Sequence, residues 1–138
     1  MITIAAMGIL KPGPEKTLVD RYLEWSRYKF SVREFDARKT KDCDRALLSA
    51  CPAGSYKIAL DEGGKQLDSQ QFAEILRKHA DVAFMIGAAD GHGALVRESS
   101  DLSLSLGRMT MAHALARVVL AEQIYRAHTI ITGHPYHR

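Results

Sequence analysis

Short apolar runs alternate with amphipathic stretches along the whole chain, and each run predicts a strand. Residues 82–86 are apolar throughout, which is the pattern of a central strand covered on both faces. Residues 2–7 form a second short apolar run, which ends at Gly8. Weaker or alternating patterns predict three more strands at residues 30–35, 56–60 and 102–106. We therefore expect five strands.

Amphipathic stretches between these runs predict helices. One begins at Pro14, because proline suits the first helical position, and another begins near Asp68, where Gln71 completes a capping box. The remaining helices are expected over residues 44–50, 94–97 and 111–127. Strand and helix alternate five times, so the predicted fold class is α/β with a largely parallel sheet.

The last predicted helix has an unusual distribution of apolar side chains. Within residues 111–127, apolar positions run almost all the way around the helix axis. Such a helix needs cover on both sides, and the sheet can supply only one. In a chain of this size we expect a second copy of the protein to supply the other. An unusually central helix within a monomer is the alternative.

Length and composition bound the architecture. With 138 residues and 46% hydrophobic content, we expect a single domain over residues 1–138. No apolar run approaches the roughly 20 residues of a membrane span, and no basic segment precedes the first apolar run, so a soluble, unexported protein is expected. Cys43 and Cys51 fit neither a disulfide framework nor a zinc site and are expected to be thiols in a reducing cytoplasm.

Charge is unevenly distributed although the net charge is only +3. Basic residues dominate residues 21–45 and the last thirty or so residues, whereas acidic residues dominate residues 61–101. If the two basic stretches meet in space, they form a surface for a polyanion. A mixed surface with no such partner is an equally good interpretation of charge alone.

Three loops follow the carboxyl ends of predicted strands, where open parallel sheets bind ligands. They comprise residues 60–65, 87–93 and 106–111, and they are rich in glycine. Their spacing matches neither a dinucleotide fingerprint nor a Walker A loop. Each loop taken alone is also consistent with a plain turn.

The C-terminal tail concentrates polar chemistry. Residues 125–138 hold three of the six histidines and end on Arg138. Either this segment is a frayed end or it folds over a site and completes it. His134 and His137 alone are a weak metal signal, and no nucleophile elbow indicates a hydrolase, so we expect no metal. His79, on an apolar helix face, is expected to be structural.

The block from Leu104 to Ala127, LSLGRMTMAHALARVVLAEQIYRA, followed by the terminal HPYHR, resembles the RlmH family of SPOUT-class methyltransferases. The matching stretches 59–65 and 84–87 fall in the expected order, so the resemblance covers nearly the whole chain. It implies a C-terminal deep trefoil knot, an exception to the rule that folds are unknotted. It also implies a homodimer built partly on the last helix.

The resemblance implies a reaction and a cofactor. The reaction is methylation of N3 of a pseudouridine in large-subunit ribosomal RNA on assembled ribosomes, with S-adenosylmethionine as methyl donor. The residues that the resemblance assigns to the cofactor are Leu60, Gly87, Leu106, Gly107, Arg108, Met109, Thr110 and Met111. Ala88 stands where the family usually has a second glycine, and residues 38–45 look shorter than usual.

Methyl transfer to an imide nitrogen needs help with its proton, and the tail offers candidates for that work. We expect His134 or His137 to act as base, and Tyr136 or Arg138 to act as donor. Phosphate contacts are expected from Arg108, Arg126 and Arg138, while Arg117 either joins them or pairs with an acid across the dimer. A non-enzymatic ribosome-binding factor and a nucleotide-binding oxidoreductase are the competing functions.

Overall fold

Five parallel strands and five helices make up the chain, and the computed structural model describes all residues from 1 to 138. The strands are β1 (Ile2–Met7), β2 (Phe30–Phe35), β3 (Tyr56–Gln66), β4 (Val82–Ile86) and β5 (Leu102–Ser105). The helices are α1 (Pro14–Trp25), α2 (Cys43–Ala50), α3 (Ser69–Lys78), α4 (Ala94–Ser99) and α5 (His113–Thr132). The strand order is β2-β1-β4-β3-β5, and every pairing is parallel, which confirms the predicted α/β class.

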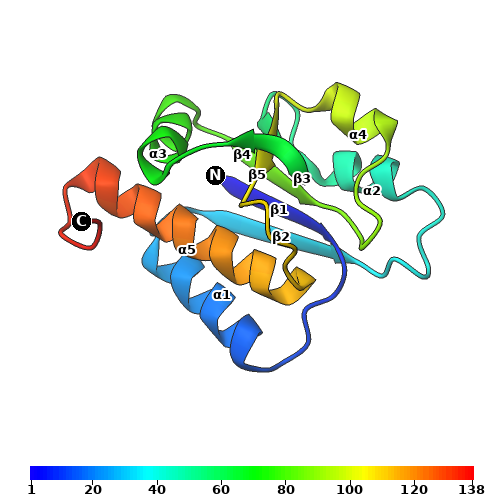
Figure 1. Ribbon diagram of the computed structural model, residues 1–138, viewed down its shortest axis with the longest axis horizontal. Coiled ribbons are helices and arrows are strands. Elements are labelled where there is room, and N and C mark those ends of the chain that lie inside the picture. The colour runs from blue at the N-terminus through cyan, green and yellow to red at the C-terminus, as the bar shows by residue number, and fades with distance from the viewer.

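The sheet lies between two layers of helices (Figure 1). α1, α3 and α5 cover one face, with α5 in contact with both of the other two, and α2 and α4 cover the opposite face. The two central strands, β1 and β4, are buried along their whole length, as continuous apolar runs predict. Their side chains alternate between the two faces, so each strand contributes to both cores.

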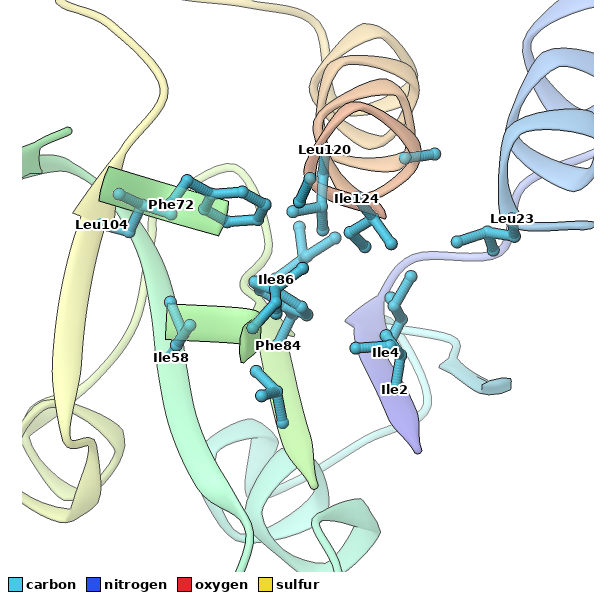
Figure 2. Packing of buried hydrophobic residues seen from close by; sticks show 14 of the residues in the cluster. Ile2, Ile4, Leu23, Ile58, Phe72, Phe84, Ile86, Leu104, Leu120 and Ile124 are labelled. Carbon is cyan, nitrogen blue, oxygen red and sulfur yellow. The ribbon is translucent and has the colours of Figure 1, made fainter. Parts of the chain in front are cut away.

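The larger core fills the space between the sheet and α1, α3 and α5 (Figure 2). Phe84 and Ile86 of β4 pack there against Leu120 and Ile124 of α5, and Phe72 of α3 lies 5.9 Å from Phe84, measured between ring centroids. A smaller core under α2 and α4 contains Ala5, Met7, Leu47, Ala59, Met85 and Val96. Burial on both faces holds the carboxyl ends of the central strands in fixed positions.

Most element bounds agree with the sequence patterns, and the capping box is confirmed, since Asp68 and Gln71 exchange both hydrogen bonds. Two predictions are wrong. The stretch 61–65, predicted as a loop, belongs to β3, because a register shift lets both Leu60 and Lys65 pair with Leu104. The last helix begins at His113 and continues to Thr132, so it absorbs the first part of the predicted tail.

Helix α5 is covered on only part of its circumference. Leu120, Ala121, Ile124 and Ala127 are buried against the sheet and its neighbouring helices, whereas Leu115 remains 53% exposed. Beside α5, Trp25 of α1 is 52% exposed. Although α5 has 20 residues, neither it nor any other helix is long and apolar enough to cross a membrane. The chain therefore leaves an apolar face on α1 and α5 unpartnered.

Two adjacent glycines in β3 provide a test of the β3–β5 packing. A Cβ atom added to Gly64 would lie 2.7 Å from the Ser103 carbonyl group, which is backbone and cannot rotate away, whereas one on Gly63 would have its nearest neighbour at 3.6 Å. We expect Gly64→Ala to lower the free energy of unfolding by about 1–3 kcal/mol, the usual range for overpacking. Gly63→Ala is the matched control and should stay close to wild type in urea denaturation. Equal effects of the two variants would contradict this close contact.

Candidate functional site

A cavity of about 560 Å³ opens beside residues 60–62 of β3 and the carboxyl end of β4 and reaches the start of α5. The carboxyl ends of parallel strands are where such sheets place ligand sites, and the volume lies in the range of small-molecule pockets. Three segments enclose it, namely residues 60–62, where the pairing of β3 with β4 ends, the loop 87–92 and the segment 106–113. The three segments selected from the sequence therefore meet around one cavity.

Seven of the eight residues that the sequence assigned to a cofactor line this cavity, and only Arg108 does not. The seven are Leu60, Gly87, Leu106, Gly107, Met109, Thr110 and Met111. Arg108 is exposed. The sequence reasoning missed several other lining residues, which are Asp61, Glu62, Ile86, Ala88, Ala89, Asp90, Gly91, His92, Arg97, Leu104, Ala112, His113 and Ala116. Most of them lie inside or next to the three predicted loops, so their closeness in sequence to these loops could have identified them as lining residues.

The loop after β4 is held by a side chain from a distant helix. Asp44 of α2 accepts backbone hydrogen bonds from Gly93 and Val96, both at 2.9 Å. Burial acts to raise the pKa of Asp44, but the N–H groups of Val96 and Gly93 outweigh it and lower the pKa. Within the loop, Gly91 has a φ of +83° and donates its N–H to the Ala88 carbonyl group at 2.8 Å. The loop is thus fixed at its far end and turns tightly in the middle.

Acidic side chains prevail around the cavity. Asp61, Glu62 and Asp90 line it, and the one lining guanidinium, that of Arg97, lies 3.4 Å from a carboxylate oxygen of Asp61. With Arg97 and Asp61 paired, Glu62 and Asp90 leave the rim with negative charge. Such a rim favours a ligand with positive charge.

Two histidines form part of the cavity wall. His92 is only 6% exposed, and its Nε2 atom lies 3.1 Å from the Met85 carbonyl oxygen, to which it donates. His113 begins α5 and packs against Gly8 at the end of β1. Burial lowers the pKa of both imidazoles, so both are neutral near pH 7.

Behind His113 lies a buried ion pair between α5 and β2. The guanidinium of Arg117, 4% exposed, contacts the carboxylate of Glu34, which also accepts the backbone N–H of Leu10 at 2.8 Å. Arg117 therefore pairs with an acid of its own chain, so a pairing across a dimer was the wrong alternative. The pair joins the first turns of α5 to the sheet edge and to the segment after β1.

The C-terminal tail is ordered against α5. Arg126 donates to Glu122 through Nε and Nη2, and through Nη1 to the Nδ1 atom of His137 at 3.0 Å. The Tyr136 hydroxyl donates to Oε2 of Glu122, the oxygen that also accepts from Nη2 of Arg126, at 3.1 Å, and the Tyr136 ring lies 4.6 Å from that of Tyr125. Burial and the Glu122 carboxylate raise the pKa of Tyr136 to about 12. The tail is therefore not a frayed end.

The hydrogen bonds of the tail fix the tautomers of its histidines. The Nδ1 atom of His134 accepts the backbone N–H of Tyr136 at 3.2 Å, and the Nδ1 atom of His137 accepts from Arg126. A nitrogen that accepts carries no proton, so in a neutral imidazole the proton resides on Nε2. Both neutral rings consequently offer an N–H donor at their outer nitrogen, and Tyr136 is a neutral phenol.

Within one chain the tail does not reach the cavity. α5 has 20 residues, about 30 Å at 1.5 Å per residue, and separates the cavity-lining His113 at its start from Gly133 at its end. Figure 1 shows the C-terminus at the end of α5 away from the segment that leads into it. None of His134, Tyr136 and His137 lines the cavity. A lid that folds over the cavity of its own chain is therefore ruled out by this arrangement.

The predicted phosphate-binding arginines differ in availability. Arg108 and Arg138 are exposed, whereas Arg126 is occupied by Glu122 and His137 and stacks over the Tyr136 ring at 4.7 Å. His79 ends α3 and stacks on Tyr56, with ring centroids 4.0 Å apart. No group of three or more histidine, cysteine or acidic side chains is arranged to hold a metal ion.

Comparisons with known proteins agree with this geometry. A family model described as a predicted SPOUT methyltransferase matches residues 1–137. The chain is 44% identical to a protein of Paramagnetospirillum magneticum named ribosomal RNA large subunit methyltransferase H, with 99% of this chain and 98% of that protein aligned. It is 43% identical to a protein of the same name from Rhodospirillum centenum, with 98% and 97% aligned.

A solved structure extends the comparison to the fold. A probable methylase family protein from Haemophilus influenzae superposes with a TM-score of 0.62 over 99% of this chain and 70% of that chain. Its sequence is only 8% identical, so this likeness concerns the fold alone. The match of nearly full length to the family model and to both relatives shows more: the chain belongs to the SPOUT methyltransferase family and is a methyltransferase.

Proposed function

We propose that this enzyme transfers the methyl group of S-adenosylmethionine to N3 of a pseudouridine in large-subunit ribosomal RNA, on assembled ribosomes. The observation that carries the proposal is that the three loops of the family resemblance enclose a single cavity. The names of its full-length relatives support ribosomal RNA as substrate. The modest net charge of +3 supports a target presented by the ribosome, because it favours weak binding of isolated RNA.

The cavity suits S-adenosylmethionine in size and charge. Backbone of Gly87 and Gly107 allows a ligand to approach closely, and Leu60, Leu106 and Met111 offer an apolar surface for an adenine ring. The acidic rim of Glu62 and Asp90 faces a cofactor that carries a sulfonium and an ammonium group. The cofactor supplies a methyl group that moves by in-line displacement, so that the carbon–sulfur bond breaks as the carbon–nitrogen bond forms.

We propose a homodimer in which each tail completes the cavity of the other chain. The unpartnered apolar face of α1 and α5, which includes Trp25 and Leu115, supplies an interface. In the proposed dimer the twofold axis is perpendicular to α5, so the two α5 helices lie side by side and antiparallel. The tail after Gly133 of one chain then lies near the first turn of the partner's α5, where the cavity opens. This arrangement reconciles a tail rich in polar groups with its distance from the cavity of its own chain.

We also propose that the tail acts through hydrogen-bond donors. As N3 releases its proton to water, negative charge develops on the two flanking carbonyl oxygens of the base. The outer Nε2–H groups of His134 and His137 and the guanidinium of Arg138 are suited to stabilise that charge. The tautomers of the two histidines favour this role over that of a base, since neither presents a free lone pair outward.

The path of the chain between β5 and α5 supports the proposed trefoil knot. β5 is at one edge of the sheet, next to β3, yet His113 packs against Gly8 at the end of β1. Residues 106–112 must therefore return past residues 60–62 of β3 and the carboxyl end of β4. A knot forms where a returning segment passes through an earlier loop, and this return brings the chain to the place where such a passage is proposed.

The direct test of the function is transfer of label from S-[methyl-³H]adenosylmethionine to ribosomes purified from a strain that lacks this protein. We expect label on assembled ribosomes, little on isolated large-subunit RNA, and mass spectrometry that locates one methyl group on N3 of a pseudouridine. Ribosomes from the parent strain, already methylated, are the control and should accept none. Label on free RNA alone, or on another nucleoside, would overturn the proposal.

A further inference from the structure

The only two buried side-chain nitrogens without a hydrogen-bond partner in this chain belong to the same cavity wall. They are Nδ1 of His92 and Nε2 of His113. Buried polar atoms are normally satisfied, so two exceptions at one site call for an explanation. Each of these nitrogens either carries no proton or carries one that donates to nothing. Protonation of either ring would therefore bury an N–H group without an acceptor.

We propose that His92 and His113 are positioning residues that hold Gly87, directly after β4, and Gly8, directly after β1, through rings that each have one buried nitrogen without a partner, and so keep the cavity in its binding shape. This inference rests on the proposed use of the cavity for S-adenosylmethionine. Neither residue was identified as functional from the sequence. Both act through the backbone that borders the cavity and not through the reacting atoms.

His92 is held by a hydrogen bond and packs beside Gly87. Its Nε2 proton is committed to the Met85 carbonyl group, two residues before Gly87. Its Nδ1 atom lies only 3.2 Å from the position that a Cβ of Gly87 would occupy, and the Gly91 backbone lies at 3.0 Å from the same point. The ring thus fills the space between β4 and the turn of the loop, and its Nδ1 atom has no acceptor within reach for a proton.

His113 packs on the neighbouring strand end. Its Nε2 atom lies 3.1 Å from the position that a Cβ of Gly8 would occupy, so the ring packs closely on the end of β1, which neighbours β4. His113 is also the first residue of α5, so its ring joins β1, β4 and α5 at the cavity.

Charged groups from each packed element face the two rings. Asp44 of α2 and Asp61 of β3 favour the charged form of His92, whereas for His113 Glu34 of β2 favours and Arg117 of α5 opposes it. Burial is the largest influence on both rings and lowers both pKa values. A histidine with a lowered pKa stabilises the folded site fully above its ordinary pKa, and the contribution is lost as pH falls below about 6.5 toward the lowered value.

Calorimetric binding of S-adenosylhomocysteine between about pH 7.5 and pH 5.5, a window that spans the ordinary histidine pKa, tests the inference. We expect the affinity of the wild-type enzyme to be constant above the ordinary histidine pKa of about 6.5 and to fall as the pH drops below it. The double variant His92→Asn and His113→Asn does not titrate there, so its affinity should be lower at neutral pH and nearly constant with pH.

Two further variants separate positioning from general effects. His128→Asn is the matched control, because His128 also has a pKa lowered chiefly by burial but sits near the far end of α5; it should keep the wild-type profile. Gly87→Ala should weaken binding at every pH without changing the slope, because its methyl group displaces the Gly91 backbone. An unchanged slope in the double asparagine variant would overturn the inference.

A second measurement does not depend on the variants folding. Histidine ring resonances of the wild-type enzyme, followed by NMR against pH, should show His92 and His113 titrating below the ordinary histidine range. Titration at or above that range would also overturn the inference. If the wild-type enzyme binds no S-adenosylhomocysteine at any pH, the proposed function fails, whereas the NMR titration still decides whether the two rings are neutral.

Discussion

Replacement of both His134 and His137 by alanine is expected to abolish methyl transfer while leaving cofactor affinity nearly unchanged. The two rings are proposed to stabilise charge on the base, and loss of one such donor typically reduces turnover about a hundredfold or more. Cofactor affinity should persist because the residues proposed to hold the cofactor all lie outside the tail. Methyl transfer to undermethylated ribosomes and calorimetry with S-adenosylhomocysteine measure the two effects separately. Full activity of this variant would contradict the role of the tail.

A glutamine variant distinguishes donors from bases. The amide of glutamine can donate from a position close to that of Nε2 but cannot take up a proton. If the histidines donate, His134→Gln with His137→Gln should retain far more activity than the alanine pair. If one of them is the base, both pairs should be equally inactive. His79→Gln, at the end of α3 and stacked on Tyr56, is the control and should behave as wild type.

Mixed dimers decide which chain supplies the tail. The alanine tail variant is combined with Gly87→Ala, which damages the cavity but leaves the tail intact. If tails act on the partner's cavity, co-expression should restore about a quarter of wild-type activity, because half of random dimers are mixed and each holds one intact site. If each tail served its own chain, no activity would return. Sedimentation of the mixture establishes that dimers form.

The largest expected effect on stability is that of Arg117→Ala. Removing this guanidinium leaves the carboxylate of Glu34 partly buried and without its partner, and the loss of one member of a buried pair costs about 3 kcal/mol. The first turns of α5 also lose their tie to β2, so the cofactor cavity should weaken together with the fold. Urea denaturation followed by circular dichroism measures the loss in free energy of unfolding.

Two comparisons sharpen this result. Arg117→Met keeps most of the side-chain volume. If it lowers the free energy of unfolding less than Arg117→Ala does, part of the effect is due to packing. Lys16→Ala breaks an exposed ion pair with Asp20 on α1 and should leave stability close to wild type, because solvent screens such pairs. Equal stability of Arg117→Ala and wild type would show that the buried pair contributes nothing to the fold.

Local patterns determined most of the secondary structure. Residues 82–86 and 2–7 form strands because continuous apolar runs require cover on both faces, and Asp68 caps α3 through bonds made within three residues. Where a long-range contact competes, the local signal failed. The stretch 61–65 has the composition of a turn, yet it extends β3 because Gly64 lets the Ser103 backbone approach.

Some parts of the candidate site could also be recognised from local sequence, whereas others depend on packing. The three segments that border the cavity could be recognised from glycine and apolar spacing, although residues 61–65 belong to β3, and the topology of a parallel sheet then brings them together. His92 and His113 carried no signal of their own, because the turn of the loop sets His92 against Gly87 and the packing of α5 on the sheet sets His113 against Gly8. Burial, which lowers their pKa values, is a property of the packed molecule.

The sequence by itself determined the α/β class, the loops that border the cavity and the concentration of polar groups in the last residues. These depend on periodicity and on residue chemistry, which are local. Only the tertiary structure decided that Arg117 pairs with Glu34, that Nδ1 of His137 accepts from Arg126, and that α5 holds the tail away from its own cavity. Those outcomes depend on distances between segments far apart in the chain, which are fixed only when the sheet and helices pack.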